Sequence, residues 1–271
     1  MVPLLSPGYA VIELITDQFA SCPPLTPVPI FSGFARAVLE GYVAGQVWVD
    51  RLESPRAAYG LHGYGMSLVW GPQVDEVFAE LGEHLRRGAY RKQDEWLQID
   101  PRWKHLDWDG AFAAQRFIRV NFRFDELLFR ARHNGPALPK GWQIASIGED
   151  GFALSDINVT PRAFWKDFAA FNAHGGGFCA IHDGDIGALG FSATRFDDWL
   201  EIGIETRAAY RGRGLARAVA VAMIEKCLAK CLTPVWACRK ENTGSLHLAQ
   251  SLGFVISAEL PFYRLAGCDG G

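Results

Sequence analysis

The chain lacks the features that mark membrane, secreted and nucleic-acid-binding proteins. No apolar run approaches the roughly 20 residues that are needed to cross a bilayer. No basic segment followed by an apolar stretch opens the chain, as a secretory signal would. The formal net charge is only −3, so neither sign is in the excess that favours nucleic acid or an anionic membrane. We therefore expect a cytoplasmic protein whose partners include neither nucleic acid nor a membrane.

The chain also lacks the spacings of metal sites and of covalent catalysis. Cys227, Cys231 and Cys238 are close in sequence, but a metal site needs a fourth ligand at similar spacing and none is present. The seven histidines form no H-E-x-x-H, and no G-x-S-x-G nucleophile elbow occurs. We predict buried, reduced thiols and no metal.

The chain has enough apolar sequence for two modest domains. Of its 271 residues, 49% are hydrophobic and 21% are charged, which is typical of a globular protein. The stretch HNGPALPKG, residues 133–141, has the Gly and Pro content of a linker. We therefore predict an N-terminal domain of residues 1–138 and a C-terminal domain of residues 139–271.

The N-terminal half is predicted to contain strands and one clear helix. Prolines indicate irregular structure up to residue 35, apart from a short helix or strand at VIELI. Further elements are two or three strands within 46–50 and 57–70, a helix over 74–87, a strand over 96–100 and a short helix from Pro101.

Residues 115–129 have the clearest strand pattern of this half. Apolar side chains on one face alternate with Arg119, Asn121 and Arg123 on the other. We interpret the arginine-bearing face as solvated, with a binding surface as the alternative.

The C-terminal half alternates strands and helices. We expect a strand over 142–147, a helical region over 150–173 with Thr160 capping Pro161, and a hairpin of 178–182 and 186–194 around Asp183-Gly184. A central strand from Trp199, a long helix to residue 231, a strand at VWAC (235–238), a helix over 243–252 and a final strand pair follow. The fold class is therefore α/β: a mixed central sheet with helices on both faces, preceded by a second, smaller α/β lobe.

The turn between the central strand and the long helix has the composition of an anion site. It reads Arg211-Gly212-Arg213-Gly214. Glycines let the backbone approach a ligand closely, and the free N–H groups of a helix start carry partial positive charge. Together with two arginines they predict a phosphate or pyrophosphate site, although the spacing matches neither a P-loop nor G-x-G-x-x-G.

Residues 211–216 have the pattern R-x-x-G-x-A, directly after a strand and at the start of a helix. This segment resembles the acyl-CoA-binding motif of the GNAT N-acetyltransferase superfamily. Residues 234–254, PVWACRKENTGSLHLAQSLGF, resemble the strand, Asn-bearing helix and L-G-F signature that follow it in GNAT proteins. The whole pattern resembles a bacterial subgroup called GNAT acetyltransferase family proteins. The resemblance is strong over residues 141–265 and faint before them.

The resemblance implies which residues bind the acyl-CoA. The pantetheine arm would pair with the open backbone of the central strand, where Thr206 would hold the arm and the Ile204 N–H would face the thioester oxygen. Asn242 matches a helix-opening Asn that contacts the arm, and it is also suited to cap the helix from Thr243. The pyrophosphate would lie on the turn and the first helical residues: Arg211, Gly212, Arg213, Gly214, Leu215 and Ala216.

The resemblance also implies where the acid and base lie. In many GNAT proteins a strand carboxylate near the position of Glu201 binds or deprotonates the amine, and Glu205 shares a strand face with it. The alternative is that these glutamates are solvated or pair with an arginine such as Arg207. Many GNAT proteins carry a Tyr general acid seven residues after the helix-opening Asn, a position that Ala249 occupies here, so Ser245 is only a weak candidate for this role.

These features predict an N-acetyltransferase. It would move an acetyl or other acyl group directly from acyl-CoA, with acetyl-CoA as the expected co-substrate, to an amine of a small molecule or a protein. The alternative is a non-catalytic sensor or assembly module that binds acyl-CoA, which the absence of the Tyr favours and the two strand glutamates oppose. The N-terminal half repeats the order of strands, Gly turn, helix and strand, so it is a candidate for a degenerate GNAT-like lobe. Its turn, Gly71-Pro72-Gln73, has no cation and too few donors for a phosphate.

Overall fold

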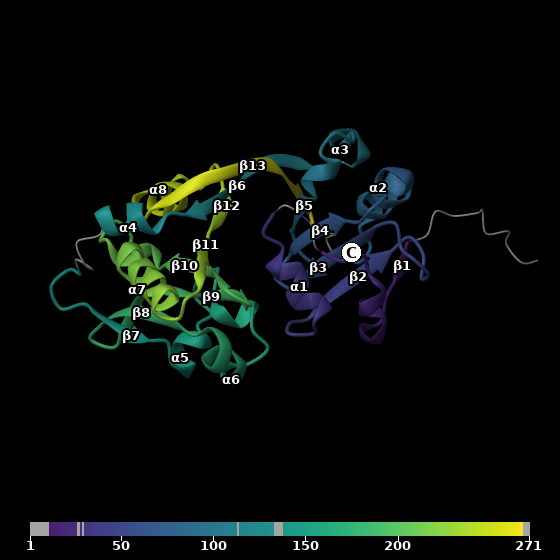
Figure 1. Ribbon diagram of the computed structural model, residues 1–271. Helices are drawn as coiled ribbons and strands as arrows, with labels where there is room; N and C mark the ends of the chain where they lie inside the picture. The colour runs from purple at the N-terminus through teal and green to yellow at the C-terminus, as the bar shows by residue number, and fades with distance from the viewer. Residues whose placement is uncertain (1–10, 26–27, 29, 113, 133–137, 268–271) are drawn as a thin grey trace, which may run out of the picture. The chain divides into compact units, whose positions relative to one another are not determined.

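The computed structural model describes residues 11–25, 28, 30–112, 114–132 and 138–267. The chain forms two compact units (Figure 1): unit 1 contains residues 1–118 and 260–271, and unit 2 contains residues 119–259. The chain passes between the units within β6 (Gln115–Phe124) and again within β13 (Phe254–Leu265). This division differs from the expected boundary after residue 138, because the end of β13 pairs with β5 of unit 1. Of the linker on which that boundary rests, residues 133–137 lie outside the described residues.

Unit 1 is built on a mixed sheet in the order β1-β2-β3-β4-β5-β13. Neighbouring strands are antiparallel except β4 and β5, which are parallel. Three strands fill the region in which two or three were expected, and the strand predicted over 96–100 is confirmed as β5. The bounds are β1 (Ile12–Glu13), β2 (Gly45–Val49), β3 (Ala58–His62), β4 (Met66–Trp70) and β5 (Glu95–Ile99).

Helices pack on both faces of the unit 1 sheet. One face carries η1 (Thr16–Ser21) and α1 (Gly33–Leu39), neither of which was expected in or beside the proline-rich segment. The other carries η2 (Asp75–Val77), α2 (Phe78–Arg87), η3 (Pro101–Trp103) and α3 (Trp108–Ala111). The predicted helix over 74–87 is confirmed, since Val77, Leu81 and Leu85 recur every four residues and are fully buried.

Unit 2 has a five-stranded sheet in the order β11-β10-β9-β8-β7. Its strand order and directions are those of β5-β4-β3-β2-β1 in unit 1, with one parallel pair, β10 and β11, at the end. Asp183 and Gly184 both have positive φ, which confirms the predicted hairpin turn. The bounds are β7 (Gln143–Ser146), β8 (Gly177–His182), β9 (Asp185–Phe196), β10 (Trp199–Thr206) and β11 (Thr233–Val235).

The helices of unit 2 include one long helix, α7 (Leu215–Ala229), which packs on β8, β9 and β10. The helical region expected over 150–173 is instead a series of short segments, and the side chain of Thr160 makes no capping bond at Pro161. The remaining segments are α4 (Glu126–Arg132), α5 (Glu149–Phe152), η4 (Pro161–Ala163), α6 (Phe168–Ala170), η5 (Phe171–Gly175), η6 (Ala208–Tyr210) and α8 (Thr243–Ser251).

The strand predicted at VWAC is in fact two strands. The chain changes partner at Trp236: β11 pairs with β10, whereas β12 (Ala237–Arg239) pairs antiparallel with β6. The Trp236 carbonyl accepts the Phe122 N–H at 3.1 Å. The final strand pair expected near residue 265 is one long strand, β13. The change of partner at Trp236 does not interrupt the apolar run VWAC, so the sequence carries no signal for it.

Five cysteines lie in the described part of the chain, and all are free thiols. Burial raises the pKa of Cys22 to about 12 and that of Cys227 to about 11. Cys231 is exposed, contrary to the expectation of buried thiols, whereas Cys268 lies outside the described residues. Among the described residues, no helix has the length and apolar character to cross a membrane.

Candidate active site

The central strand β10 has one edge that is open over most of its length. β9 pairs with it from Trp199 to Thr206, but β11 pairs only with Trp199–Glu201 on the other side. Beyond that point the chain has turned away at Trp236 to pair with β6. Within the described ranges, residues 202–206 of β10 therefore have no strand partner on this edge.

The backbone of Ile204 and Thr206 points to this open edge. The Arg207 N–H donates to the Gly187 carbonyl at the end of the β9 pairing, at 3.0 Å. Backbone groups of successive residues in a strand point to opposite edges, so those of Ile204 and Thr206 face away from β9. The side-chain oxygen of Thr206 is buried and has no hydrogen-bond partner in the part of the chain that the structure describes.

The Gly-rich turn follows β10 after the short helix η6, and it is open on its outer side. Gly212 and Gly214 have φ of +74° and +78°, and an added Cβ would meet no atom within 4 Å at either. Gly214 is the N-cap of α7, and no described side chain caps the first-turn N–H groups. Arg211 and Arg213 are exposed beside them, and the Arg213 guanidinium lies 5.4 Å from the centre of the Tyr210 ring. The turn thus combines uncapped donors with two cations.

The first residues of α7 anchor the turn in the fold. Leu215 is buried against the sheet together with Val219, and Ala216 is half-buried. The apolar anchor fixes the helix start while the turn itself stays exposed.

Glu205 belongs to the turn end of β10. Its Oε1 lies 3.5 Å from Nη2 of Arg211 and accepts the Thr206 N–H at 3.3 Å. Arg211 also donates to the Thr206 carbonyl at 3.2 Å. Glu205 therefore contributes to the position of Arg211.

Glu201 lies near the other end of β10 in a more enclosed setting. Its side chain is 15% exposed, and its Oε1 lies 3.7 Å from Nη2 of Arg119. Thr194 of β9 donates to Oε2 at 3.3 Å. Burial raises the pKa of Glu201, and both Arg119 and Thr194 oppose that rise. The arginine beside Glu201 is Arg119. Arg207, which the sequence suggested as a partner, binds Asp156 and the Ile186 carbonyl instead.

Arg119 lies buried beside Glu201, a position that the sequence pattern did not indicate. The face of β6 interpreted as solvated is buried over Arg119 and Asn121, which are each 8% exposed. Only Arg123, further along the strand, is exposed. The alternation of polar and apolar residues was correct, but it could not show that another strand supplies a carboxylate to the polar face. Burial lowers the pKa of Arg119, while Glu201 opposes the change.

Asn242 and Ser245 lie together at the start of α8. Asn242 is the N-cap, and its side chain accepts the Ser245 N–H at 3.1 Å, as expected for a helix from Thr243. The Ser245 hydroxyl accepts the Trp236 indole N–H at 3.0 Å. Ala249, in the position of the usual Tyr, is fully buried. Ser245 thus lies beside the residue at which β11 and β12 separate.

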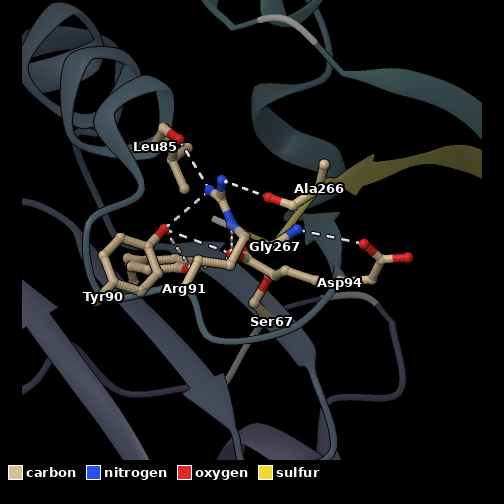
Figure 2. A network of polar contacts seen from close by, with 9 residues as sticks. Ser67, Leu85, Tyr90, Arg91, Asp94, Ala266 and Gly267 are labelled. Carbon is tan, nitrogen blue, oxygen red and sulfur yellow. Dashed lines mark hydrogen bonds and ion pairs between the residues drawn. The ribbon is translucent and has the colours of Figure 1, made fainter. Parts of the chain in front are cut away.

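Unit 1 contains a different buried polar cluster (Figure 2). Glu95 binds Arg91 at 2.8 Å and accepts the hydroxyls of Tyr59 and Ser67, each at 2.5 Å. Arg91 also donates to the Leu85 and Ala266 carbonyls. A cavity of about 280 Å³ borders this cluster. Because the protein itself supplies the partners of both charges, the cluster is best explained as part of the fold.

Comparison with known proteins agrees with the fold. A B. subtilis (strain 168) protein named Uncharacterized N-acetyltransferase YdfB is 24% identical over 93% of this chain and 97% of its own length. A GCN5-related N-acetyltransferase-like protein from Streptococcus suis has a similar structure, with a TM-score of 0.68 at 21% identity over 93% of this chain and 99% of that one. A tandem GNAT protein from the clavulanic acid pathway has a TM-score of 0.55 at 15% identity over 97% and 99%.

The model of the GNAT acetyltransferase family matches residues 31–263. This match covers most of the chain, including most of the described part of unit 1, and it extends further towards the N-terminus than the resemblance seen in the sequence. The fold class is the predicted one, with mixed sheets and helices on their faces. The chain therefore belongs to the GNAT acetyltransferase family and is an acyltransferase of this type.

Proposed function

We propose that unit 2 transfers an acetyl or other acyl group from acyl-CoA directly to an amine, in the cytoplasm. The observation that supports this most is the open edge of β10, which is followed, after η6, by a glycine turn with uncapped helix donors and two exposed arginines. A β-strand edge and a helix start at its end suit a long ligand that carries amide groups and a pyrophosphate.

In this proposal the residues predicted from the sequence divide into three groups. The N–H groups that begin at Gly214 and the cations Arg211 and Arg213 bind the pyrophosphate. The backbone of Ile204 and Thr206, with the Thr206 hydroxyl, pairs with the pantetheine arm. Asn242 remains a candidate contact for the arm in addition to its role as a helix cap.

Glu201 is the proposed base. An ammonium is not nucleophilic, so the amine must give up a proton before its nitrogen forms a bond to the acyl carbon and the carbon–sulfur bond breaks. Burial raises the pKa of Glu201 towards the range in which a carboxylate can accept that proton. The Ile204 N–H is directed at the open edge, where it would stabilise negative charge on the thioester oxygen. The thiolate leaves and takes up a proton from water or from the positively charged nitrogen of the tetrahedral intermediate, which must lose one to become the amide.

Unit 1 is proposed to be a degenerate GNAT-like lobe that does not bind acyl-CoA. Its strands have the same order and directions as those of unit 2. The turn after β4 is closed, because an added Cβ on Gly71 would lie 2.4 Å from the Arg56 carbonyl oxygen. Asp75 and Glu76 occupy the first turn that follows, where they repel an anion. This lobe would have a structural or substrate-shaping role.

The experiment that tests the proposal measures the release of free CoA thiol from acetyl-CoA in the presence of a panel of amines. Calorimetric titration with acetyl-CoA accompanies it, so that binding is measured apart from turnover. We expect micromolar to millimolar affinity and thiol release that depends on the amine. Binding without any amine-dependent release would instead support a sensor or assembly module.

A further inference from the structure

Asn121 is the least satisfied buried polar side chain near Glu201. It is 8% exposed, and neither its amide oxygen nor its amide nitrogen has a hydrogen-bond partner among the described residues. Most buried polar groups in folded proteins are hydrogen-bonded, so this side chain requires an explanation.

The polar residues around Glu95 in unit 1 provide the contrast (Figure 2). There a buried carboxylate has the hydroxyls of Tyr59 and Ser67 and the guanidinium of Arg91 as partners. An unsatisfied buried amide destabilises a fold, and a leucine of similar volume avoids that cost. A polar side chain kept at such a cost is typical of a site where function is favoured over stability.

The position of Asn121 connects it to the proposed base. Arg119 and Asn121 are two residues apart in β6 and therefore share one face of the strand. The Arg119 guanidinium lies beside Glu201. Asn121 pairs with Ala237 on β12, and Glu201 pairs with Val235 on β11. Their partners are thus two residues apart, on either side of Trp236, where the strands separate. The amide and the carboxylate flank the same separation point.

We propose that Asn121, together with the Arg119–Glu201 pair, forms the subsite for the acceptor amine, and that this acceptor carries an uncharged oxygen close to its amine. This inference rests on the proposed function. The Asn121 amide offers one acceptor, for an N–H of the substrate, and one donor, for an oxygen near that N–H. Amino alcohols and α-amino amides, including the N-terminus of a peptide, have both groups at this spacing.

The charges of the subsite exclude a second cation on the acceptor. Arg119 neutralises Glu201, so the buried pair has no net charge and cannot favour a diamine. A second ammonium next to the Arg119 guanidinium would add like-charge repulsion in a poorly solvated place. Polyamines are therefore disfavoured, although a lone strand glutamate would suit them.

The test compares kcat/KM for amines that differ by one feature. Ethanolamine and propylamine are nearly equal in size, and only ethanolamine has the oxygen; glycinamide and putrescine extend the series. For the wild type we expect ethanolamine and glycinamide to exceed propylamine by about tenfold, the contribution of roughly one hydrogen bond, and putrescine to be the poorest. In Asn121→Leu the ratio of ethanolamine to propylamine falls to about one, and the melting temperature is equal to or above that of the wild type. Asn121→Ala provides the same ratio if the leucine variant does not fold.

The control is Arg123→Gln, on the exposed part of the same strand, which should keep the wild-type ratio. A wild type that releases thiol with amines, together with an Asn121→Leu variant of unchanged ratio, would overturn the subsite and leave the proposed function intact. A wild type that releases no thiol with any amine would overturn the proposed function and the subsite with it.

Discussion

In the described part of each unit a glutamate lies beside an arginine in the interior, and the two pairs differ in separation and in burial. In unit 1, Glu95 and Arg91 are 2.8 Å apart, with side chains that are 1% and 6% exposed. In unit 2, Glu201 and Arg119 are 3.7 Å apart, with side chains that are 15% and 10% exposed. In the first pair the protein supplies partners to both charged groups. In the second, Thr194 donates a hydroxyl to Glu201, and the Asn121 amide, on the same strand face as Arg119, has no partner among the described residues. The same residue types thus support the fold in one unit and a candidate reaction in the other.

The turn that follows β4 in unit 1 and the turn that follows β10 and η6 in unit 2 also differ: the first is closed and acidic, and the second is open and basic. Gly71 is enclosed by backbone, and the next helical residues are acidic. Gly212 and Gly214 are open, and arginines flank them. A shared topology therefore does not imply a shared ligand, because the function depends on the local donors and charges.

The largest expected effect is at Glu201. Removing a general base typically lowers a rate by about a hundred- to ten-thousand-fold, so Glu201→Gln should reduce kcat by that amount and leave acetyl-CoA affinity unchanged. Single-turnover kinetics and calorimetry measure the two quantities. Glu205→Gln, whose carboxylate positions Arg211, should weaken binding more than it slows the chemical step. Full activity in the double variant would leave only proximity to explain the rate.

Glu95→Gln should give the opposite result. It leaves the Arg91 guanidinium buried with a weakened partner, which typically costs about 3–5 kcal/mol. Denaturant unfolding should show this loss of stability, while kcat measured below the unfolding transition stays near the wild-type value. A variant of normal stability, or one that binds acetyl-CoA normally and has lost turnover, would give the unit 1 pair a role that we assign to unit 2 alone.

The sequence predicted the features that depend on neighbouring residues and missed those that depend on contacts between distant strands. The hairpin at Asp183-Gly184, the helix with Leu81 and Leu85 on one face, and the glycine turn are local patterns, and all are present as predicted. The burial of Arg119 and Asn121 depends on a strand more than 70 residues away, and alternation along β6 cannot reveal it. The partner change at Trp236 was missed for the same reason, because β11 and β12 form one continuous apolar run.

Gly214→Glu should show whether the glycine turn of unit 2, and not the turn at Gly71 in unit 1, binds acetyl-CoA. A carboxylate at this position places negative charge where the pyrophosphate would bind, and the left-handed φ of +78° adds strain. We expect acetyl-CoA affinity to fall by about a hundredfold, measured by calorimetry, with the fold retained. Pro72→Glu, which introduces the same charge at the exposed position after Gly71, is the matched control and should not change binding. Equal effects of the two substitutions would mean that unit 1 takes part in binding.

Arg119→Gln should change the pH dependence of kcat/KM. The guanidinium lowers the pKa of Glu201 and burial raises it, so removing the cation leaves only the Thr194 hydroxyl to oppose burial and the pKa rises further. A base must be ionised, and the acidic limb of the kcat/KM profile should therefore move to higher pH by about one unit or more. The rate at low pH then falls about tenfold and recovers at high pH. An unshifted profile, or a shift equal to that in Arg123→Gln, would separate Arg119 from the titration of Glu201.

The smallest effect is expected at Ser245, at the start of α8. This helix begins with a side-chain cap, as α3 of unit 1 does: Asp107 accepts the Gly110 N–H at 3.0 Å, and Asn242 accepts the Ser245 N–H at 3.1 Å. The Ser245 hydroxyl accepts the indole N–H of Trp236, so its loss costs about one hydrogen bond of stability.

Ser245→Ala should therefore lower the melting temperature slightly and change kcat by less than about threefold. Water or the positively charged nitrogen of the tetrahedral intermediate can protonate the departing thiolate, and Ala249 gives the site no phenol for this step. A pH–rate profile with one amine decides the matter. If the wild type has a basic limb near the thiol pKa and Ser245→Ala lacks it, Ser245 is the general acid. In that case α8 contributes chemistry that α3 of unit 1 does not.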